Sequence, residues 1–459
     1  MKVYGLIRFD IEDFLTRESD EALEFIMDVM DEFHMPASYS IVGKKAQILH
    51  EHDRQHILQR LKTKHALGFH SATHSEHPTL SEELAEMDYE PGVKRFVERE
   101  GRGVDMVAKL IKPPRYFTQP GGNWVPQAAD ALAQLNMPVF FSDGWNSYIV
   151  TSPQPMWIED IVHWSLPVLN PKPFAMKLPD NLDEAVEMVE KAPSQLSQGD
   201  AFMIMVHPTE LVTTKFWDAV NFKFGATIAT LRGAPLRSHN DMVETFESFR
   251  TYIRQIAQAP NVEWTDILEL SARLKPLSSP YLGNRYELLS HLLKNGLGPA
   301  VVHGESFSAA EEVLSLALYC IGATSGQELP RVKAPRDWSQ DNESVPGSSL
   351  PPMTFEGVKS GAGEIIEHVR QCRRLPHGVG TKLVSIENWA YSAVFHLSHS
   401  FNKTIPQTFS LPLTFLDYVK EPSQLHWDWP IFPPEFQPYR LWRDTQRIAW
   451  SLKPAQYRH

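Results

Sequence analysis

The N-terminal part of the chain alternates short apolar runs with amphipathic stretches. Residues 2–9 (KVYGLIRF) and 37–43 (ASYSIVG) are short and largely apolar, which predicts buried strands. Residues 20–33 carry their large apolar side chains on one stripe and predict a helix, and a second helix is predicted over 53–62. This order of strand, helix, strand and helix predicts parallel strands with helices outside them.

Acidic and imidazole side chains follow the predicted strands. Asp10, Glu12 and Asp13 come at the end of the first strand, and His70 and His74 lie in an HSATH stretch after a later one. Catalytic residues of parallel α/β folds gather at the C-terminal ends of strands. Carboxylates and imidazoles hold a divalent cation while leaving a position for water. An isolated H-x-x-x-H pair is a weak signal among nineteen histidines, but its place after a strand strengthens it.

Three segments resemble the first two motifs of the NodB-type polysaccharide deacetylases, which form the fourth carbohydrate esterase family. They are FDIED at 9–13, ASYSIVG at 37–43 and HALGFHSATH at 65–74. The resemblance implies a distorted (β/α) barrel, commonly seven-stranded, and a divalent metal such as Zn²⁺. It also implies hydrolysis of an N-acetyl, sometimes O-acetyl, group on an amino sugar.

The resemblance also implies a role for each matching residue. Asp10 matches the general base, His70 and His74 match the metal-binding histidines, and Ser71 matches the hydroxyl that steadies their loop. The metal-binding acid stands two residues after the base in one form of the motif, which is Glu12 here. The other form would place it at Ile11, which cannot bind a metal. Glu12 is therefore the expected ligand, and Asp13 is the alternative.

A later segment matches the final motif of the family. Residues 202–208 (FMIMVHP) form an apolar run that ends in His207, and the resemblance makes His207 the general acid toward the leaving amine. The alternative is a histidine that only ends a strand. In the segment 141–145 (FSDGW), Asp143 is expected to orient His207 and Trp145 to form an aromatic wall for a sugar, against the alternative of a surface turn.

The third motif departs from the family pattern. The family carries an arginine there that orients the base, whereas residues 115–122 (RYFTQPGG) place Thr118 at that position. Pro120 and Gly121 are kept and are candidate substrate contacts, although a tight turn also accounts for the glycines. Arg115 lies nearby, but the sequence does not show whether it reaches Asp10. This departure leaves room for a substrate other than a common polysaccharide.

Composition limits the partners and the compartment. A formal charge of −12 and a pI near 5.9 argue against nucleic acid or an anionic membrane as the main partner. The two cysteines, Cys320 and Cys372, provide neither a disulfide framework nor a thiolate metal cluster. The chain enters a strand at once, without a secretory leader, and has no uninterrupted apolar stretch of ~20 residues. We expect a cytoplasmic protein without a membrane span.

The chain divides by its patterns into two parts. Residues 1–275 form the deacetylase-like part, with its last helices expected near 241–258 and 266–274. Residues 276–459 are expected to form a mainly helical C-terminal domain. It contains a duplicated unit and a polar linker rich in Pro and Ser. The two copies of the unit span 287–319 and 364–396, and the linker spans 325–352.

These observations predict a metal-dependent hydrolase that removes an acetyl group from an amino sugar or glycan. Two alternatives stay open, namely an amidohydrolase of a small or cyclic amide on the same fold and a degenerate barrel that only binds glycans. A narrow pocket closed by residues 207–225 would favour the small amide, and an open groove lined by Trp124 and Trp145 would favour the glycan. The altered third motif supports the binder, whereas the retained acid and histidines count against it.

Overall fold

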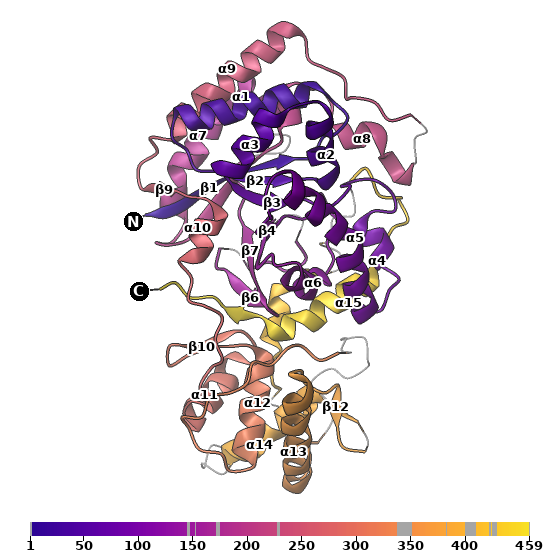
Figure 1. The fold of residues 1–459 in the computed structure, drawn as a ribbon. Helices are drawn as coiled ribbons and strands as arrows, with labels where there is room; N and C mark the ends of the chain where they lie inside the picture. The colour runs from indigo at the N-terminus through magenta and orange to yellow at the C-terminus, as the bar shows by residue number, and fades with distance from the viewer. Residues whose placement is uncertain are drawn as a thin grey trace.

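A curled sheet of parallel strands forms the centre of the molecule (Figure 1). The computed structural model describes residues 2–144, 147–151, 153–170, 175–226, 230–336, 351–381, 383–399, 410–421, 424 and 429–458. Seven parallel strands follow one another in the order β7-β5-β4-β3-β2-β1-β8. They are β1 (Val3–Ile11), β2 (Ser38–Ile41), β3 (Ala66–Phe69), β4 (Tyr116–Phe117), β5 (Val139–Asp143), β7 (Ile161–Leu166) and β8 (Ala201–Val206).

The two ends of this seven-strand series meet. Residues beyond β7 run beside β8, where the N–H of Met203 donates to the carbonyl of Pro167 (2.9 Å) and the N–H of Leu169 donates to the carbonyl of Met203 (3.0 Å). The sheet therefore closes into an irregular barrel, which confirms the predicted distorted (β/α) barrel. β9 (Val262–Trp264) pairs with β1, and β6 (Met156–Ile158) and β14 (Lys453–Pro454) extend the sheet beyond β7.

Helices cover the outside of the barrel (Figure 1). They are α1 (Glu18–Glu32), α2 (Gly43–Glu51), α3 (Gln55–Thr63), α4 (Leu80–Leu84), α5 (Tyr89–Leu110), α6 (Ala128–Gln134), α7 (Leu178–Gln195), α8 (Trp217–Asn221), α9 (His239–Ile256) and α10 (Ile267–Ala272). The apolar stripe that predicted α1 is buried, with Leu23, Ile26 and Met27 fully covered. The helix α2 was not predicted, because few large apolar side chains mark its buried face. The helices of the described residues lack the length or apolar character needed to cross a membrane.

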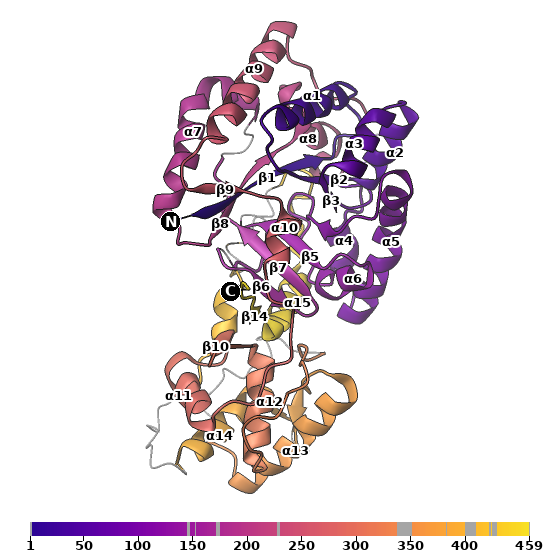
Figure 2. The ribbon, with the colours of Figure 1, turned by 60° about the vertical axis from the view of Figure 1, so that its left-hand side comes forward.

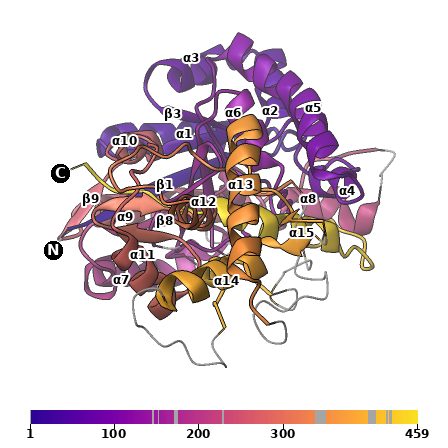
Figure 3. The same cartoon turned by 90° about the horizontal axis from the view of Figure 1, so that it is seen from below.

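A helical region lies below the barrel in the views of Figures 1 and 2, and Figure 3 shows it from its own end. It contains α11 (Arg285–Asn295), α12 (Ala309–Cys320), α13 (Phe355–Cys372) and α14 (Ile386–His399), and the hairpins β10 (Ala300–Val302) with β11 (Glu305–Phe307) and β12 (Gly378–Val379) with β13 (Val384–Ser385). Each of the two similar segments thus folds as helix, antiparallel hairpin and helix. Ser308 begins α12 with a capping box that also uses Glu311.

The end of the chain returns to the barrel. α15 (Tyr439–Ile448) lies beside the barrel, and β14 pairs antiparallel with β6 (Figure 2). Residues 429–458, which were expected to belong to the helical domain, therefore pack on the barrel as well, while Lys453 pairs with Glu311 of α12 at 3.1 Å. Within the expected linker 325–352, residues 337–350 lie outside the described residues.

Buried ion pairs join the helical region to the barrel. Lys333 and Arg374 approach Asp130 of α6 at 2.6 and 2.8 Å, and Arg374 lies 3.4 Å from Glu159. Burial, with Asp130 close by, raises the pKa of Glu159 to about 7, while the two cations oppose that shift. Removal of one partner would leave a buried charge without compensation.

We predict that Arg374→Met lowers the free energy of unfolding by about 3–5 kcal/mol, because Asp130 and Glu159 lose a buried cation. Arg370→Met is the matched control, since Arg370 is exposed and pairs only at the surface with Glu367. Its effect should stay within about 0.5 kcal/mol. Denaturant unfolding of both variants provides the measurement, and equal effects would contradict the assigned role of the buried pairs.

Candidate active site

The predicted site residues meet at the mouth of the barrel. The carboxyl ends of β1, β3, β5 and β8 bring together Asp10, Glu12, His70, His74, Asp143 and His207. Each of these residues is at most 8% exposed. They line a small cavity in which the volume open to the centre of a water-sized molecule is about 30 Å³.

Glu12, His70 and His74 form a group with the geometry of a metal site. One donor atom from each lies within 4.8 Å of the others. Oε2 of Glu12 is 2.7 Å from Nε2 of His74 and 3.3 Å from Nε2 of His70. Burial alone would raise the pKa of Glu12, but His74 and His207 outweigh it and hold that pKa well below its usual value. An ionised carboxylate facing two imidazoles is a suitable ligand set for a divalent cation.

The outer nitrogen of each histidine is held by a hydroxyl group. Nδ1 of His70 lies 2.7 Å from Oγ1 of Thr118, and Nδ1 of His74 lies 2.6 Å from Oγ of Ser75. Ser75 in turn donates to Asp218 at 3.2 Å. Metal-binding histidines are oriented in this way, with one nitrogen bonded to the protein and the other turned to the cation. The residues present therefore fit a divalent metal.

Asp13, the alternative ligand, lies outside this group. Its Oδ1 accepts hydrogen bonds from the N–H groups of Leu15 and Thr16, both at 2.9 Å, and its Oδ2 accepts one from Thr209 at 2.6 Å. Both oxygens are thus used to hold the turn before α1 and to tie it to the loop after β8. The structure favours Glu12 over Asp13 as the ligand.

Arg8 is the cationic partner of the expected base. Its guanidinium donates to Oδ2 of Asp10 at 2.7 Å and lies 3.8 Å from Asp143. Arg115, the arginine considered from the sequence, is exposed. Burial works to raise the pKa of Asp10, but Arg8, His70 and His207 lower it below its usual value. The other oxygen of Asp10, Oδ1, is buried and has no hydrogen-bond partner among the described residues, so it is available to accept a proton.

Glu210 holds His207 in place. Its Oε1 lies 3.0 Å from Nδ1 of His207, while Nε2 of His207 lies 3.8 Å from Oδ2 of Asp10. Burial lowers the pKa of His207, but Glu12 and Glu210 raise it to about 9, so the imidazole carries a proton near neutral pH. The orienting role that was expected of Asp143 therefore falls to Glu210, and Asp143 lies beside Arg8 instead.

Of the residues that were expected to contact the substrate, one lines the cavity, two hold the loops around it, and one is not described. Ser71 accepts a hydrogen bond from the N–H of His74 (2.9 Å) and so steadies the loop rather than lining the cavity. Gly121 lines the cavity with φ at +46°. Pro120 accepts a hydrogen bond from the N–H of Asn123 and forms part of the turn. Trp145 lies outside the described residues.

Sequence reasoning missed four residues that support the site, namely Arg8, Thr118, Glu210 and Trp217. Arg8 could have been found, because residues two apart on a strand point to the same side. Thr118 was located but its contact with His70 was not foreseen. Trp217 donates from Nε1 to Oε1 of Glu12 at 2.9 Å, across a separation of 205 residues that no local pattern reveals.

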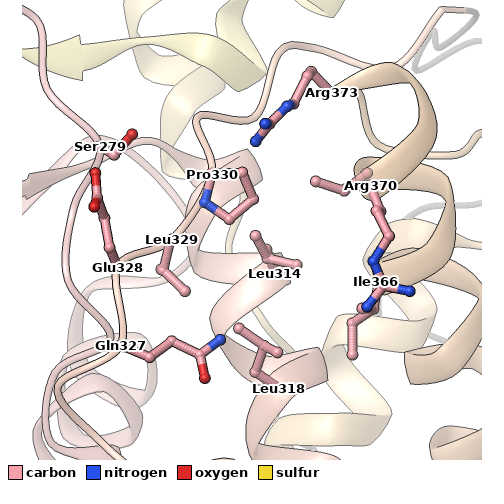
Figure 4. Close-up of a pocket in the computed structure, with 11 residues that line it drawn as sticks. Ser279, Leu314, Leu318, Gln327, Glu328, Leu329, Pro330, Ile366, Arg370 and Arg373 are labelled. Carbon is pink, nitrogen blue, oxygen red and sulfur yellow. The ribbon is translucent and has the colours of Figure 1, made fainter.

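The structure also contains a much larger cavity, between α12 and α13 in the helical region (Figure 4). The volume open to the centre of a water-sized molecule is about 450 Å³ there. Leu314, Leu318 and Ile366 form apolar walls, and Arg370 and Arg373 lie at one side (Figure 4). Among the described residues, the Glu12 group is the one that combines metal-ligand types closely enough to hold a cation. The smaller cavity is therefore the candidate active site.

Comparison with known proteins gives matches in structure. No protein-family model matches the chain, and no curated protein matches it either. A protein from Mycobacterium smegmatis described as a polysaccharide deacetylase is 13% identical, with a TM-score of 0.38, and the match covers 61% of this chain and 94% of that one. A peptidoglycan deacetylase from Bacillus subtilis is 13% identical, with a TM-score of 0.31 and coverage of 59% and 91%.

A CE4-family pseudoenzyme from Bacillus anthracis is also similar, at 12% identity and a TM-score of 0.32, with coverage of 58% and 65%. The similar structures thus include CE4-family deacetylases, the family that the motifs resemble. At these identities the likeness concerns the fold, and the function has to be judged from the side chains of this chain.

We predict that Glu12→Gln, His70→Ala and His74→Ala each abolish retention of zinc or cobalt, because each removes one of the three ligands. Asp13→Asn is the matched control, since it changes a neighbouring buried acid outside the ligand group and should keep the metal. Metal analysis after dialysis, with circular dichroism to verify the fold, provides the measurement. Loss of metal from Asp13→Asn alone would show that the ligand set is wrongly assigned.

Proposed function

We propose that the chain is a metal-dependent hydrolase that removes an N-acetyl or O-acetyl group from an amino sugar or glycan. One observation carries this proposal: the group Glu12, His70 and His74 lies in the same cavity as a buried acid, Asp10, and a buried histidine, His207. A site that only binds glycans has no need for all five side chains. The same apparatus would also hydrolyse other amides and esters.

The cation in this proposal is Zn²⁺, which suits two imidazoles and one carboxylate. Held by Glu12, His70 and His74, it would lower the pKa of a water molecule and polarise the acyl oxygen. The residues around it provide the remaining chemistry. Thr118 and Ser75 keep the two imidazoles turned toward the cavity, as the hydrogen-bond partners of metal-binding histidines do.

Asp10 takes the proton from the attacking water. Its free oxygen, Oδ1, is the acceptor, because Oδ2 already accepts the hydrogen bond from Arg8. Arg8 keeps Asp10 ionised and fixes the direction of its carboxylate. His207 then donates a proton from Nε2 to the leaving nitrogen, since an amine anion is too poor a leaving group to depart unaided. Acid–base assistance of this kind contributes about 10²–10⁴-fold to a rate.

A small or cyclic amide is a second candidate substrate. The cavity is small, and Phe216, from the loop between β8 and α8, forms part of its wall. An open groove lined by Trp124 would have favoured a glycan, but Trp124 is 1% exposed and donates from Nε1 to Thr445. A narrow site of this kind favours a small substrate over an extended glycan.

The proposed location is the cytoplasm. Cys320 and Cys372 are both free, which suits a reducing compartment. The proposed partner is the acetylated substrate, and the net charge of −12 disfavours nucleic acid.

We predict that Asp10→Asn retains the metal but loses most activity, by about 10²-fold or more, because the base is removed while the ligands stay. The measurement is release of acetate, or ring opening, by zinc- or cobalt-loaded protein acting on acetylated amino sugars, chito-oligomers and cyclic amides. An Asp10→Asn protein as active as the wild type would exclude Asp10 as the base.

We predict that Arg8→Met lowers turnover by about tenfold or more, because Asp10 loses a charge-assisted hydrogen bond that fixes its direction. Metal content should stay unchanged, since Arg8 does not belong to the ligand group. Arg8→Lys should restore part of kcat, and Arg115→Met should behave as wild type because Arg115 is exposed. A fall in activity caused by Arg115→Met and not by Arg8→Met would reverse the assignment.

A further inference from the structure

A segment from the C-terminal end of the chain, residues 429–436, lies on the mouth of the barrel. The N–H groups of Phe224 and Gly225 donate to the carbonyls of Pro430 and Ile431, both at 2.8 Å. Ile431 and Phe432 are 0% and 2% exposed. They pack in an apolar cluster with Phe14, Val42, Trp217, Phe222 and Ala234, which come from the loops around the site. The segment is therefore anchored to the barrel by its own buried side chains.

Trp429 extends from this segment to the wall of the cavity. Its ring packs against Phe216 at 5.8 Å, and Phe216 packs against His207 at 5.0 Å. On the other side the indole lies against Gly121, where an added Cβ atom would come within 3.2 Å of Nε1 of Trp429. Gly121 is thus favoured by its positive φ, and the indole lies close to the space that a Cβ atom would take.

Hydrogen bonds connect the indole to a metal ligand. Nε1 of Trp429 donates to Oδ2 of Asp218 at 3.0 Å, and Oγ of Ser75 donates to the same oxygen at 3.2 Å. Oγ of Ser75 is also 2.6 Å from Nδ1 of His74. One carboxylate oxygen therefore orients both the wall of the cavity and one imidazole of the metal group, so the indole has a defined position relative to the proposed cation.

We propose that Trp429 sets the size of the substrate that reaches the metal group, and that it admits a small acylated molecule or the end of a glycan but not an internal sugar of a polymer. This inference rests on the proposed function and narrows it. A sugar with neighbours on both sides needs a groove that is open at two ends. Here the indole, Phe216 and the loop at Gly121 line a small cavity, with about 30 Å³ open to the centre of a water-sized molecule.

Because the segment 429–436 is anchored by other side chains, the proposed limit on substrate size depends on Trp429 alone within that segment. Ile431 and Phe432 keep the backbone of the segment in place, whereas Trp429 is only half-buried. Removal of the indole should open the cavity without releasing the segment.

The test uses hydroxamates, which bind divalent cations through two oxygens, as probes of two sizes. Acetohydroxamate and 2-naphthohydroxamate are titrated into cobalt-saturated full-length protein, and Kd is read from the cobalt absorption spectrum. The wild type should prefer the small probe, and Trp429→Ala should reduce that preference by about tenfold or more, because pockets discriminate by about that factor for even small differences in size. The ratio of kcat/KM for a chito-oligomer to that for N-acetylglucosamine should rise in parallel.

Two further variants distinguish the size of the Trp429 ring from the loss of its hydrogen bond and from the general effect of removing a tryptophan. Trp429→Phe removes the hydrogen bond to Asp218 but keeps a large ring, so it should keep most of the preference of the wild type. Trp442→Ala is the matched control, because Trp442 is also half-buried and donates from Nε1, to the carbonyl of Lys420 at 2.9 Å, but does not line the cavity. It should bind both probes as the wild type does.

Each outcome has a clear meaning. Equal binding of both probes by cobalt-loaded wild type, or an unchanged preference in Trp429→Ala, overturns the role of Trp429 and leaves the proposed hydrolase intact. If Trp429→Ala and Trp429→Phe reduced the preference for the small probe equally, the hydrogen bond to Asp218 would matter and the size of the ring would not. That result would also overturn the proposed role of Trp429. Failure of the wild type to bind cobalt overturns the metal centre and this inference together.

Discussion

Three carboxylates are buried at the mouth of the barrel, where little water reaches them. Their need for compensating charge governs the arrangement of the site. Asp10, Glu12 and Glu210 are each at most 3% exposed. A buried carboxylate is costly unless it is paired or bound to a metal. Arg8 compensates Asp10, and the imidazoles compensate the other two carboxylates. A cation beside Glu12 would complete this balance, so the candidate ligand group and the proposed acid–base pair depend on one another.

The supporting contacts reach the site from unexpected places. In the family that the motifs resemble, an arginine of the third motif orients the base, and that position holds Thr118 here. Thr118 instead fixes the ring of His70, and Arg8 approaches Asp10 from β1 itself. Both contacts are short and buried. The base has its cationic partner and the first histidine its fixed orientation, although the arginine is missing from its usual segment.

The C-terminal residues belong to the barrel as much as the N-terminal ones do. β14 adds to the sheet beside β6, Thr445 of α15 accepts the hydrogen bond from Trp124, and Trp429 completes the cavity. The helical region is thus an insertion between two parts of the barrel unit, held to it by Lys333 and Arg374. A boundary at residue 275 would separate the cavity from one of its walls.

Local patterns determined the strands near the start of the chain, the helix over 20–33, and the position of Asp10, His70 and His207 at strand ends. Parallel strands bring such ends to one mouth, so the metal group could be foreseen from the order of the motifs. Only the tertiary structure decided that Glu210 rather than Asp143 holds His207, that Trp217 holds Glu12 and that Trp429 closes the cavity. The physical reason is that periodicity records which side of an element is buried. Which polar groups then face one another depends on how the sheet curls and where distant segments pack.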